Sequence, residues 1–114
     1  MEYIDIVAMC GTRFMRVQVK ASNLGYRAYS RPKYNFFTKD QQGNPLSHSL
    51  IDIVALVALD QRKVVFELPR NLKRRTTRLS EHFHDIDIER ITWENAVTQI
   101  LGEAYGVRSR PEVS

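Results

Sequence analysis

The feature that most constrains this chain is a regular alternation of apolar and polar residues on both sides of a glycine. Two β-rich runs, Tyr3 to Met9 and Arg13 to Lys20, flank the segment Cys10-Gly11-Thr12. A glycine at the first central position favours a type II′ hairpin turn. Residues whose numbers add to 23 then face each other across the hairpin. A slip of one residue would bury the polar groups and expose the valines, so the pattern resists it.

This register separates the side chains of the hairpin into an apolar face and a polar face. The apolar face takes the pairs Ile4–Val19, Ile6–Val17 and Ala8–Met15. On the opposite face, which also carries Tyr3, Asp5 lies directly across from Gln18. Lys20 follows on the same side, two residues further along the second strand. The hairpin therefore brings a carboxylate, an amide and an ammonium group to one face.

The rest of the chain reads as short strands followed by one helix. We expect strands at Tyr34–Thr38 and Thr76–Leu79, the latter at an edge, and a second hairpin from Ile51–Leu59 and Lys63–Leu68 around Asp60-Gln61-Arg62. The first strand of that hairpin is apolar enough to lie centrally in a sheet. Thr92 is the expected N-cap of the helix, which Gly102 closes. The apolar face of this helix would be Trp93, Ala96, Val97, Ile100 and Leu101.

Length and composition indicate one domain. The chain has 114 residues, 43% of them hydrophobic and 26% charged, which is ordinary for a globular protein. Its longest apolar run, Ile53 to Leu59, is far shorter than the roughly 20 residues of a membrane-spanning helix. Acidic Glu2 and Asp5 are unlike a secretory signal, and the single Cys10 excludes an internal disulfide and a cysteine-based zinc site. We expect a soluble, cytoplasmic domain over residues 1–106, a flexible tail over 107–114 and no membrane partner.

The charge pattern suggests a polyanionic partner. Lysine and arginine number 17 against 13 acidic residues, a net charge of +4. One basic cluster is interleaved with tyrosines, a mixture typical of nucleic-acid surfaces. The candidate DNA contacts are Arg27, Arg31 and Lys33 in that cluster, and Arg70, Lys73, Arg74, Arg75 and Arg78 in an acid-free stretch. The alternative interpretation is a solvated loop with a few packed tyrosines.

The polar face of the first hairpin has the minimal chemistry of a metal-dependent phosphodiesterase. A Mg²⁺ ion prefers oxygen ligands, and Asp5, Gln18 and the backbone carbonyl of Val19 can supply three. Lys20 would lie near the attacking water or the scissile phosphate and offset the charge that develops there. The alternative is that these side chains form the exposed polar face of an ordinary hairpin.

These residues resemble the PD-(D/E)XK nuclease superfamily. The strings Asp5-Ile6-Val7 and Arg16-Val17-Gln18-Val19-Lys20-Ala21-Ser22 are similar to the group I intron-associated homing endonucleases of that superfamily, in which glutamine commonly takes the (D/E) place. The resemblance spans Tyr3 to Val97. Later segments agree in order: Gly25-Tyr26-Arg27, Asp52, Val64 to Pro69, Arg74 to Thr77, and Trp93 at the start of a helix.

The resemblance implies an α/β fold with a small mixed sheet of the restriction-endonuclease-like type and a C-terminal helix. It implies cleavage of double-stranded DNA with Mg²⁺ or Mn²⁺, with Asp5 as metal ligand, Gln18 as second ligand or positioning group, and Lys20 as catalytic lysine. Ile4 stands where the motif has proline, and Gln18 is neutral where most relatives have an acid. The usual N-terminal helix with its glutamate is not expected here. A homo-oligomer (dimer or tetramer) or a partner chain supplying that helix is therefore expected.

Other interpretations remain open. His82, His84 and Asp85 could hold a metal, or they are exposed residues near a turn. Asp52 and His48 could lie near the site, or they are a strand-start capping group and a surface imidazole. For the whole chain, the alternatives to an endonuclease are a catalytically incomplete DNA-binding subunit with a nuclease fold, and an interaction protein unrelated to nucleic acid.

Overall fold

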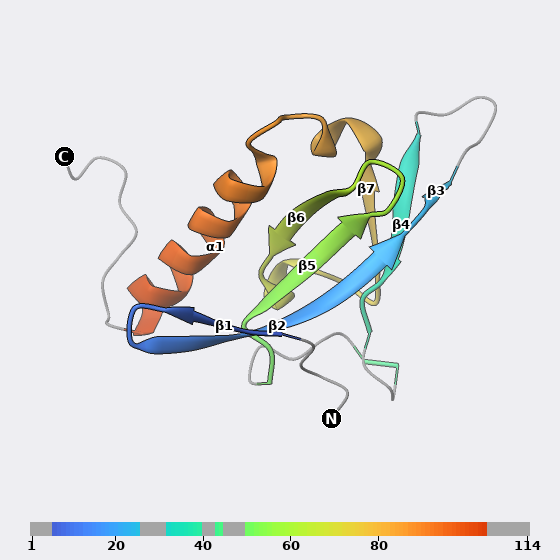
Figure 1. The fold of residues 1–114 in the computed structure, drawn as a ribbon. Coiled ribbons are helices and arrows are strands. Elements are labelled where there is room, and N and C mark those ends of the chain that lie inside the picture. The colour runs from blue at the N-terminus through green and yellow to red at the C-terminus, as the bar shows by residue number, and fades with distance from the viewer. Residues whose placement is uncertain (1–5, 26–31, 40–42, 45–49, 105–114) are drawn as a thin grey trace.

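A computed structural model describes residues 6–25, 32–39, 43–44 and 50–104 of the chain (Figure 1). Its strands are β1 (Ile6–Cys10), β2 (Arg13–Ser22), β3 (Leu24–Gly25), β4 (Lys33–Phe37), β5 (Ile53–Ala58), β6 (Lys63–Glu67) and β7 (Arg75–Leu79). Its helices are α1 (Ile88–Ala104) and two short 3₁₀ turns, η1 (Pro69–Asn71) and η2 (Ser80–Phe83). The expected strands and C-terminal helix are present, and α1 is the one α-helix in the described ranges.

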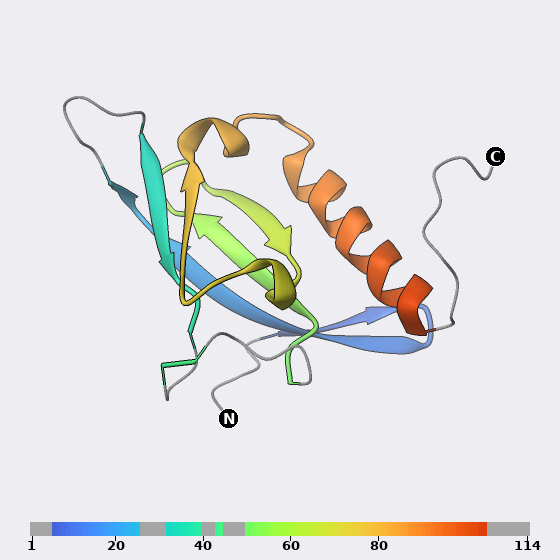
Figure 2. The same cartoon turned by 180° about the vertical axis from the view of Figure 1, so that it is seen from behind.

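The elements form three layers. A four-stranded sheet with the order β1-β2-β5-β6 lies in the middle, and a three-stranded sheet with the order β3-β4-β7 lies beside it. Helix α1 covers one face of the four-stranded sheet, and the smaller sheet packs on the other side (Figures 1 and 2). The four-stranded sheet is mixed, because β2 pairs antiparallel with β1 and parallel with β5. The α/β class with a mixed sheet is therefore confirmed.

The register of the first hairpin is the one that its sequence predicts. Ile6 pairs with Val17 and Ala8 with Met15, and the strands close at Cys10 and Arg13. Gly11 has a φ of +63°, as the first central position of a type II′ turn requires. The pairs expected for residues 3–5 lie outside the described residues.

Strand β2 is covered on both faces, which its alternating pattern does not predict. Met15 and Val17 are buried beneath α1, as expected for the apolar face. On the other face Gln18 is only 7% exposed, so the expectation that this amide stays out of the interior is wrong. Conversely, Ile6 on the apolar face is 51% exposed. Whether one of these side chains is exposed to solvent depends on whether a second layer packs over it, and not on the pattern of its own strand alone.

The second hairpin forms as predicted, with β5 inside the sheet and β6 at its edge. Five of the six residues of β5 are buried, because α1 lies over one of its faces and the smaller sheet over the other. Arg62, in the loop between the strands, has a φ of +54°. The continuous apolar run of β5 was therefore a correct indication of a central strand.

The helix begins four residues before the predicted N-cap, at Ile88, and runs past Gly102 to Ala104. Thr92 is therefore inside the helix, and its prediction as N-cap is wrong. The Thr92 hydroxyl donates to the carbonyl of Ile88 at 2.7 Å and accepts the backbone N–H of Phe66 on β6 at 3.0 Å. Glu89 accepts the N–H of Val64 in the same way at 3.1 Å. Helix side chains thus satisfy the outward N–H groups of an edge strand.

The predicted apolar face of α1 does pack on the sheet. Ala96 and Ile100 are buried, and Trp93, Val97 and Leu101 pack against the same cluster. The Trp93 ring meets Phe66 edge to face, with ring centroids 5.0 Å apart. No helix within the described residues is long and apolar enough to cross a membrane.

The smaller sheet is joined to the β5–β6 loop through a buried tyrosine. Tyr34 on β4 packs against Phe36 and Phe83, and its hydroxyl donates to the carboxylate of Asp60 at 2.6 Å. Gln61 donates to the same hydroxyl at 2.8 Å. Burial and the bond to Asp60 both raise the pKa of the Tyr34 phenol. The hydroxyl therefore stays protonated and holds the two sheets together.

The bond between Thr92 and the edge of β6 can be tested directly. Replacing Thr92 by valine keeps the shape but leaves the N–H of Phe66 without its acceptor, which should lower the free energy of unfolding by about 1–2 kcal/mol. The exposed Thr98 on the same helix is the matched control, and Thr98→Val should change stability by less than about 0.5 kcal/mol. Urea unfolding measures both. Equal effects of the two substitutions would contradict the assigned role of Thr92.

Candidate functional site

The predicted catalytic residues of β2 lie on one face of the four-stranded sheet. Gln18 and Lys20 alternate along the strand, opposite Val54 and Leu56 of β5. Because side chains in register on neighbouring strands point to the same side, both face the layer that contains the smaller sheet. Gln18 is buried, whereas Lys20 is half-buried. The structure thus brings the amide and the ammonium group to one face, and Asp5 lies outside the described residues.

Asp52, just before β5, forms the main ion pair of the described structure. Its carboxylate accepts the backbone N–H of Arg16 at 2.7 Å and the guanidinium of the same residue at 2.9 and 3.1 Å. The guanidinium of Arg13 lies 3.7 Å away. The backbone N–H of Asp52 in turn donates to the carbonyl of Arg16 at 2.9 Å. Of the two interpretations left open, the structure favours a strand-start group bound to Arg16.

This arrangement holds Asp52 ionised. Burial alone would raise the pKa of its carboxyl group, but the hydrogen bonds from Arg16 and the nearby positive charges lower it below the ordinary value. The hydrogen bond to Asp52 raises the pKa of Arg16, so both partners stay charged. A carboxylate with two guanidinium groups beside it is a poor ligand for a metal ion, because their positive charges already compensate its negative charge.

The described residues alone do not complete a magnesium site. Gln18 offers one neutral side-chain oxygen on this face. Glu67 shares the face, since it pairs with Val54, but its carboxylate accepts the guanidinium of Arg78 at 3.1 and 3.2 Å. Within the described ranges no three His, Cys, Asp or Glu side chains gather closely enough to hold a metal. The donor set fits a magnesium ion only if Asp5 adds its carboxylate.

The predicted DNA contacts divide into exposed and engaged groups. Exposed cations on or near the smaller sheet are Lys33, Lys73, Arg74 and Arg75. Arg78 is half-buried and paired with Glu67, and Arg70 donates to the side-chain oxygen of Gln99 at 3.1 Å. Thr38 donates its hydroxyl to the carbonyl of Lys73 and so fixes the start of this segment. Arg27, Arg31 and His48 lie outside the described residues.

The outer face of the smaller sheet carries a feature that the sequence analysis missed. Phe37 at the end of β4 is 57% exposed. The guanidinium carbon of Arg75 lies 5.2 Å from the centre of its ring, and the Lys39 ammonium 5.9 Å. The alternation of β4, with Tyr34 and Phe36 buried, was the signal that would have placed Phe37 outward.

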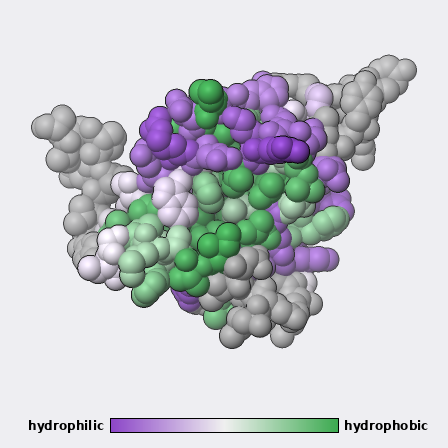
Figure 3. All heavy atoms as spheres, viewed as in Figure 1, coloured by the Kyte–Doolittle hydropathy of each residue, from purple (hydrophilic) through white to green (hydrophobic). Residues whose placement is uncertain are grey.

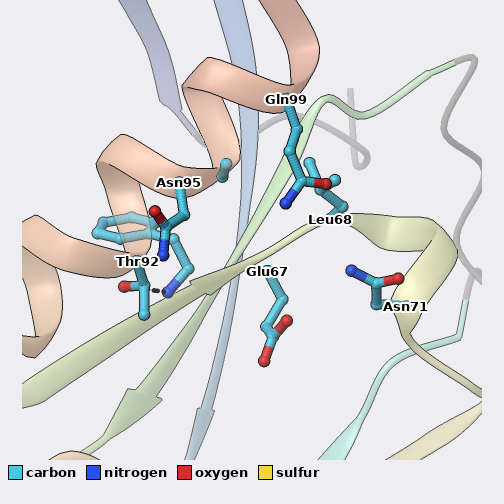
Figure 4. Close-up of a pocket in the computed structure, with 8 residues that line it drawn as sticks. Glu67, Leu68, Asn71, Thr92, Asn95 and Gln99 are labelled. Atoms are coloured by element: carbon cyan, nitrogen blue, oxygen red, sulfur yellow. Dashed lines mark hydrogen bonds between the residues drawn. The ribbon is translucent and has the colours of Figure 1, made fainter. Parts of the chain in front are cut away.

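A small polar pocket of about 190 Å³ lies between α1 and the end of β6 (Figure 4). Asn95 and Gln99 project from the helix, and Asn71 of η1 lies on the other side of the pocket. Thr92 and Ala96 form the helix wall beneath them, and the remaining lining residues are Phe66, Glu67 and Leu68. None of the predicted catalytic residues lines this pocket.

The first hairpin presents an apolar surface. Ile6, Val7 and Met9 on β1 and Phe14 on β2 are each more than half exposed. In Figure 3, apolar side chains gather across the lower half of the view, on the side of the molecule where Figure 1 shows the hairpin. Strand β1 is also an edge strand of its sheet. Such an exposed apolar edge is suited to contact with another chain.

Among the described residues, His82 in η2 and His84 just after it are not part of any cluster that could hold a metal. His82, His84 and Asp85 are all exposed, and His84 lies 3.4 Å from the hydroxyl of Ser80. Asp85 accepts the backbone N–H of Asp87 at 2.8 Å. The structure therefore favours the interpretation of exposed residues near a turn.

Comparisons with known proteins supply no relative. Family models, curated proteins and solved structures were each searched, and none matches this chain.

The ion pair of Asp52 predicts a specific dependence of stability on pH. Because folding lowers the pKa of this carboxyl group, its stabilising effect is present above the unfolded value of about 4 and is lost as the pH falls through the folded value. Asp52→Asn should cost about 2 kcal/mol at pH 7, less than for a fully buried pair, since Arg16 is partly exposed. Urea unfolding should show this deficit shrinking at pH 3.

The control for Asp52 is a surface carboxylate. Glu94 pairs with Arg90 on the exposed side of α1 at 3.2 Å. Glu94→Gln should change stability by less than about 1 kcal/mol at pH 7. An Asp52→Asn deficit that is equally large at pH 7 and pH 3 would show that charge is not the cause.

Proposed function

We propose that this chain is a metal-dependent endonuclease that hydrolyses phosphodiester bonds in double-stranded DNA, of the PD-(D/E)XK homing-endonuclease type that its sequence resembles. One observation carries the proposal: Gln18 and Lys20 lie on the same face of a strand in the interior of the sheet. The hairpin register over residues 6–10 and 13–17 supports it further, because it is the register from which the position of Asp5 was predicted.

In this proposal each side chain has a separate task. Asp5 supplies the charged oxygen of the metal site, and Gln18 and the carbonyl of Val19 supply neutral oxygens. A bound Mg²⁺ or Mn²⁺ ion supplies Lewis-acid stabilisation of the phosphate and lowers the pKa of a bound water. Lys20 holds a positive charge at the reacting phosphate, where negative charge grows as water attacks and the ester bond breaks.

The half-buried position of Lys20 suits this task. A lysine that is partly withdrawn from water interacts more strongly with a phosphate than a fully exposed one, because the local dielectric constant is lower. Gln18 lies two residues away on the same strand and is held by burial. The amide can therefore position ligands without carrying charge into the interior, where an unpaired carboxylate would be costly.

Exposed cations would hold the DNA backbone. Lys33, Lys73, Arg74 and Arg75 are exposed around the smaller sheet and the segment that leads into β7. Each phosphate that they neutralise releases counterions, so binding should weaken steeply as salt rises. Arg27 and Arg31, outside the described residues, are further proposed contacts, while Arg70 and Arg78 would first have to leave Gln99 and Glu67.

The proposal includes an oligomer, a dimer or tetramer, or a partner chain that completes the site. The exposed apolar residues of β1 and its position at a sheet edge support contact with another chain. A second chain would also help so small a fold to span a long DNA site.

A catalytically incomplete DNA-binding subunit is the second candidate function. The observation that favours it is the absence, within the described residues, of a carboxylate cluster next to Gln18. Such a subunit would keep the basic surface and the nuclease fold without cutting DNA.

Cleavage of supercoiled plasmid and long linear duplex in Mg²⁺ tests the nuclease. Lys20→Ala should slow cleavage about 100-fold or more, because it removes a charge used in the transition state, while leaving DNA binding within about twofold. Asp5→Ala should abolish metal-dependent cleavage. Each reaction should be run with the chain alone and with proteins encoded beside it.

Lys63→Ala is the matched control for Lys20. Lys63 is also a half-buried lysine of the four-stranded sheet, but it lies on β6, two strands away from β2. The Lys63→Ala variant should cleave DNA at the same rate as the unaltered chain. Undiminished cleavage by both Lys20→Ala and Asp5→Ala would remove the nuclease assignment, and DNA binding without any cleavage would favour the second candidate.

A further inference from the structure

We infer that the outer face of the β3-β4-β7 sheet is a binding site for unpaired single-stranded DNA, on which Phe37 stacks a base while Lys39 and Arg75 bind the flanking phosphates. The geometry of the face carries the stacking site, and the choice of DNA rests on the proposed function.

Three cross-strand pairs build this face. Strands β4 and β7 are antiparallel, with Phe37 opposite Arg75, Asn35 opposite Thr77 and Lys33 opposite Leu79. Their burial patterns show which way these residues point. Lys33, Asn35 and Phe37 are exposed on β4, and Arg75 and Thr77 are exposed on β7.

The fixed inner side of the sheet makes the outer side a rigid platform. Tyr34 and Phe36, which alternate with these exposed residues, are fully buried against Val54, Leu56 and Phe83. Thr38 bonds to Thr76 at 2.7 Å across the same two strands. Phe37 therefore cannot turn into the core, because the core positions beside it are already filled.

The groups beside Phe37 match a nucleotide. Its ring is 57% exposed, and the positive groups of Arg75 and Lys39 lie over the ring, 5.2 and 5.9 Å from its centre, so a base that stacks on the ring displaces them toward the phosphates on either side. Proteins that bind single strands without reading their sequence stack bases on aromatic rings and bind the phosphate backbone with nearby positive charges. No acidic residue stands among the exposed residues of β4 and β7, so nothing there repels a phosphate.

The middle of the face adds polar groups and a further charge. The Thr77 hydroxyl donates to the side-chain oxygen of Asn35 at 2.9 Å. The amide nitrogen of Asn35 takes no part in this hydrogen bond. Lys33 lies four residues from Phe37 along β4, a distance of about 13 Å in an extended strand. The face is thus long enough for more than one nucleotide, and Lys33 places a third cation along it.

An unpaired strand fits better than a duplex. The ring of Phe37 offers its surface to a base, and the bases of a duplex already stack on one another. An aromatic ring can use its π-surface only where a base is free, as in a single strand. The duplex would contact only the cations of this face, and Phe37 would then contribute little.

Binding of a fluorescently labelled single-stranded DNA 12-mer, measured by anisotropy in EDTA, tests the inference. We expect binding that weakens with salt, and a Kd about tenfold higher for Phe37→Ala and Phe37→Leu, which both lack a ring. Ile86→Ala is the matched control, because Ile86 is a large apolar side chain that is 84% exposed but lies between η2 and α1, away from the smaller sheet's outer face. The Kd of this control variant should lie within twofold of the Kd of the unaltered chain.

A second variant reports stacking directly. Phe37→Trp should keep the affinity and add an indole whose fluorescence the DNA quenches. The unaltered chain, whose one tryptophan is Trp93 on α1, should show no such quenching. Circular dichroism of every variant checks that the fold is kept.

Several results would overturn the inference. One is an equal loss of affinity for Phe37→Ala and Ile86→Ala, and another is an equal loss of duplex and single-strand binding on Phe37→Ala. Tighter binding of the matching RNA 12-mer, or absence of binding, would also overturn it. Because EDTA removes divalent metal, no cleavage occurs in this experiment. A failed nuclease test with intact Phe37-dependent binding, or the reverse, therefore separates this inference from the proposed function.

Discussion

The bond between Arg16 and Asp52 is the constraint on which the rest of the structure depends. It joins β2 to the start of β5 through one backbone and two side-chain hydrogen bonds to a single carboxylate. Parallel strands need a long crossover, and nothing local in the chain holds their register. The ion pair contributes to the register here, in which Gln18 lies beside Val54 and Lys20 beside Leu56. The crossover itself contributes β3 and β4, which become part of the layer that covers this face.

Local patterns could predict the elements but not the layers. Alternation and Gly11 determine the first hairpin, and the apolar run of β5 marks a central strand, because both signals act between neighbouring residues. Gln18 is buried because a second sheet, formed by distant segments, covers it, and no pattern within β2 predicts this burial. The same holds for Thr92. Its sequence context is that of a helix cap, yet its hydroxyl serves the N–H of Phe66 on another element.

Strand β4 connects the two proposed sites. Its inward residues Tyr34 and Phe36 fill the core against β5, on the face to which Gln18 and Lys20 belong. Its outward residue Phe37 lies beside Arg75 and Lys39 on the opposite side of the same strand. The alternation of a single five-residue strand thus supports both the interior next to the proposed nuclease residues and the exterior proposed to bind a nucleic-acid strand. Both proposals require the smaller sheet to be rigid, and the bond of Tyr34 to Asp60 contributes to that rigidity.

The central proposal is that Asp5 and Gln18 bind one divalent ion. Replacing the ion by Fe²⁺ in the presence of ascorbate and peroxide generates hydroxyl radicals that cut the polypeptide near the ion, and mass spectrometry locates the cuts. The account predicts cuts around residues 18–20 and near residue 5, suppressed by excess Mg²⁺ and by Asp5→Ala. Cuts confined to the segment from His82 to Asp85, or spread evenly along the chain, would contradict it.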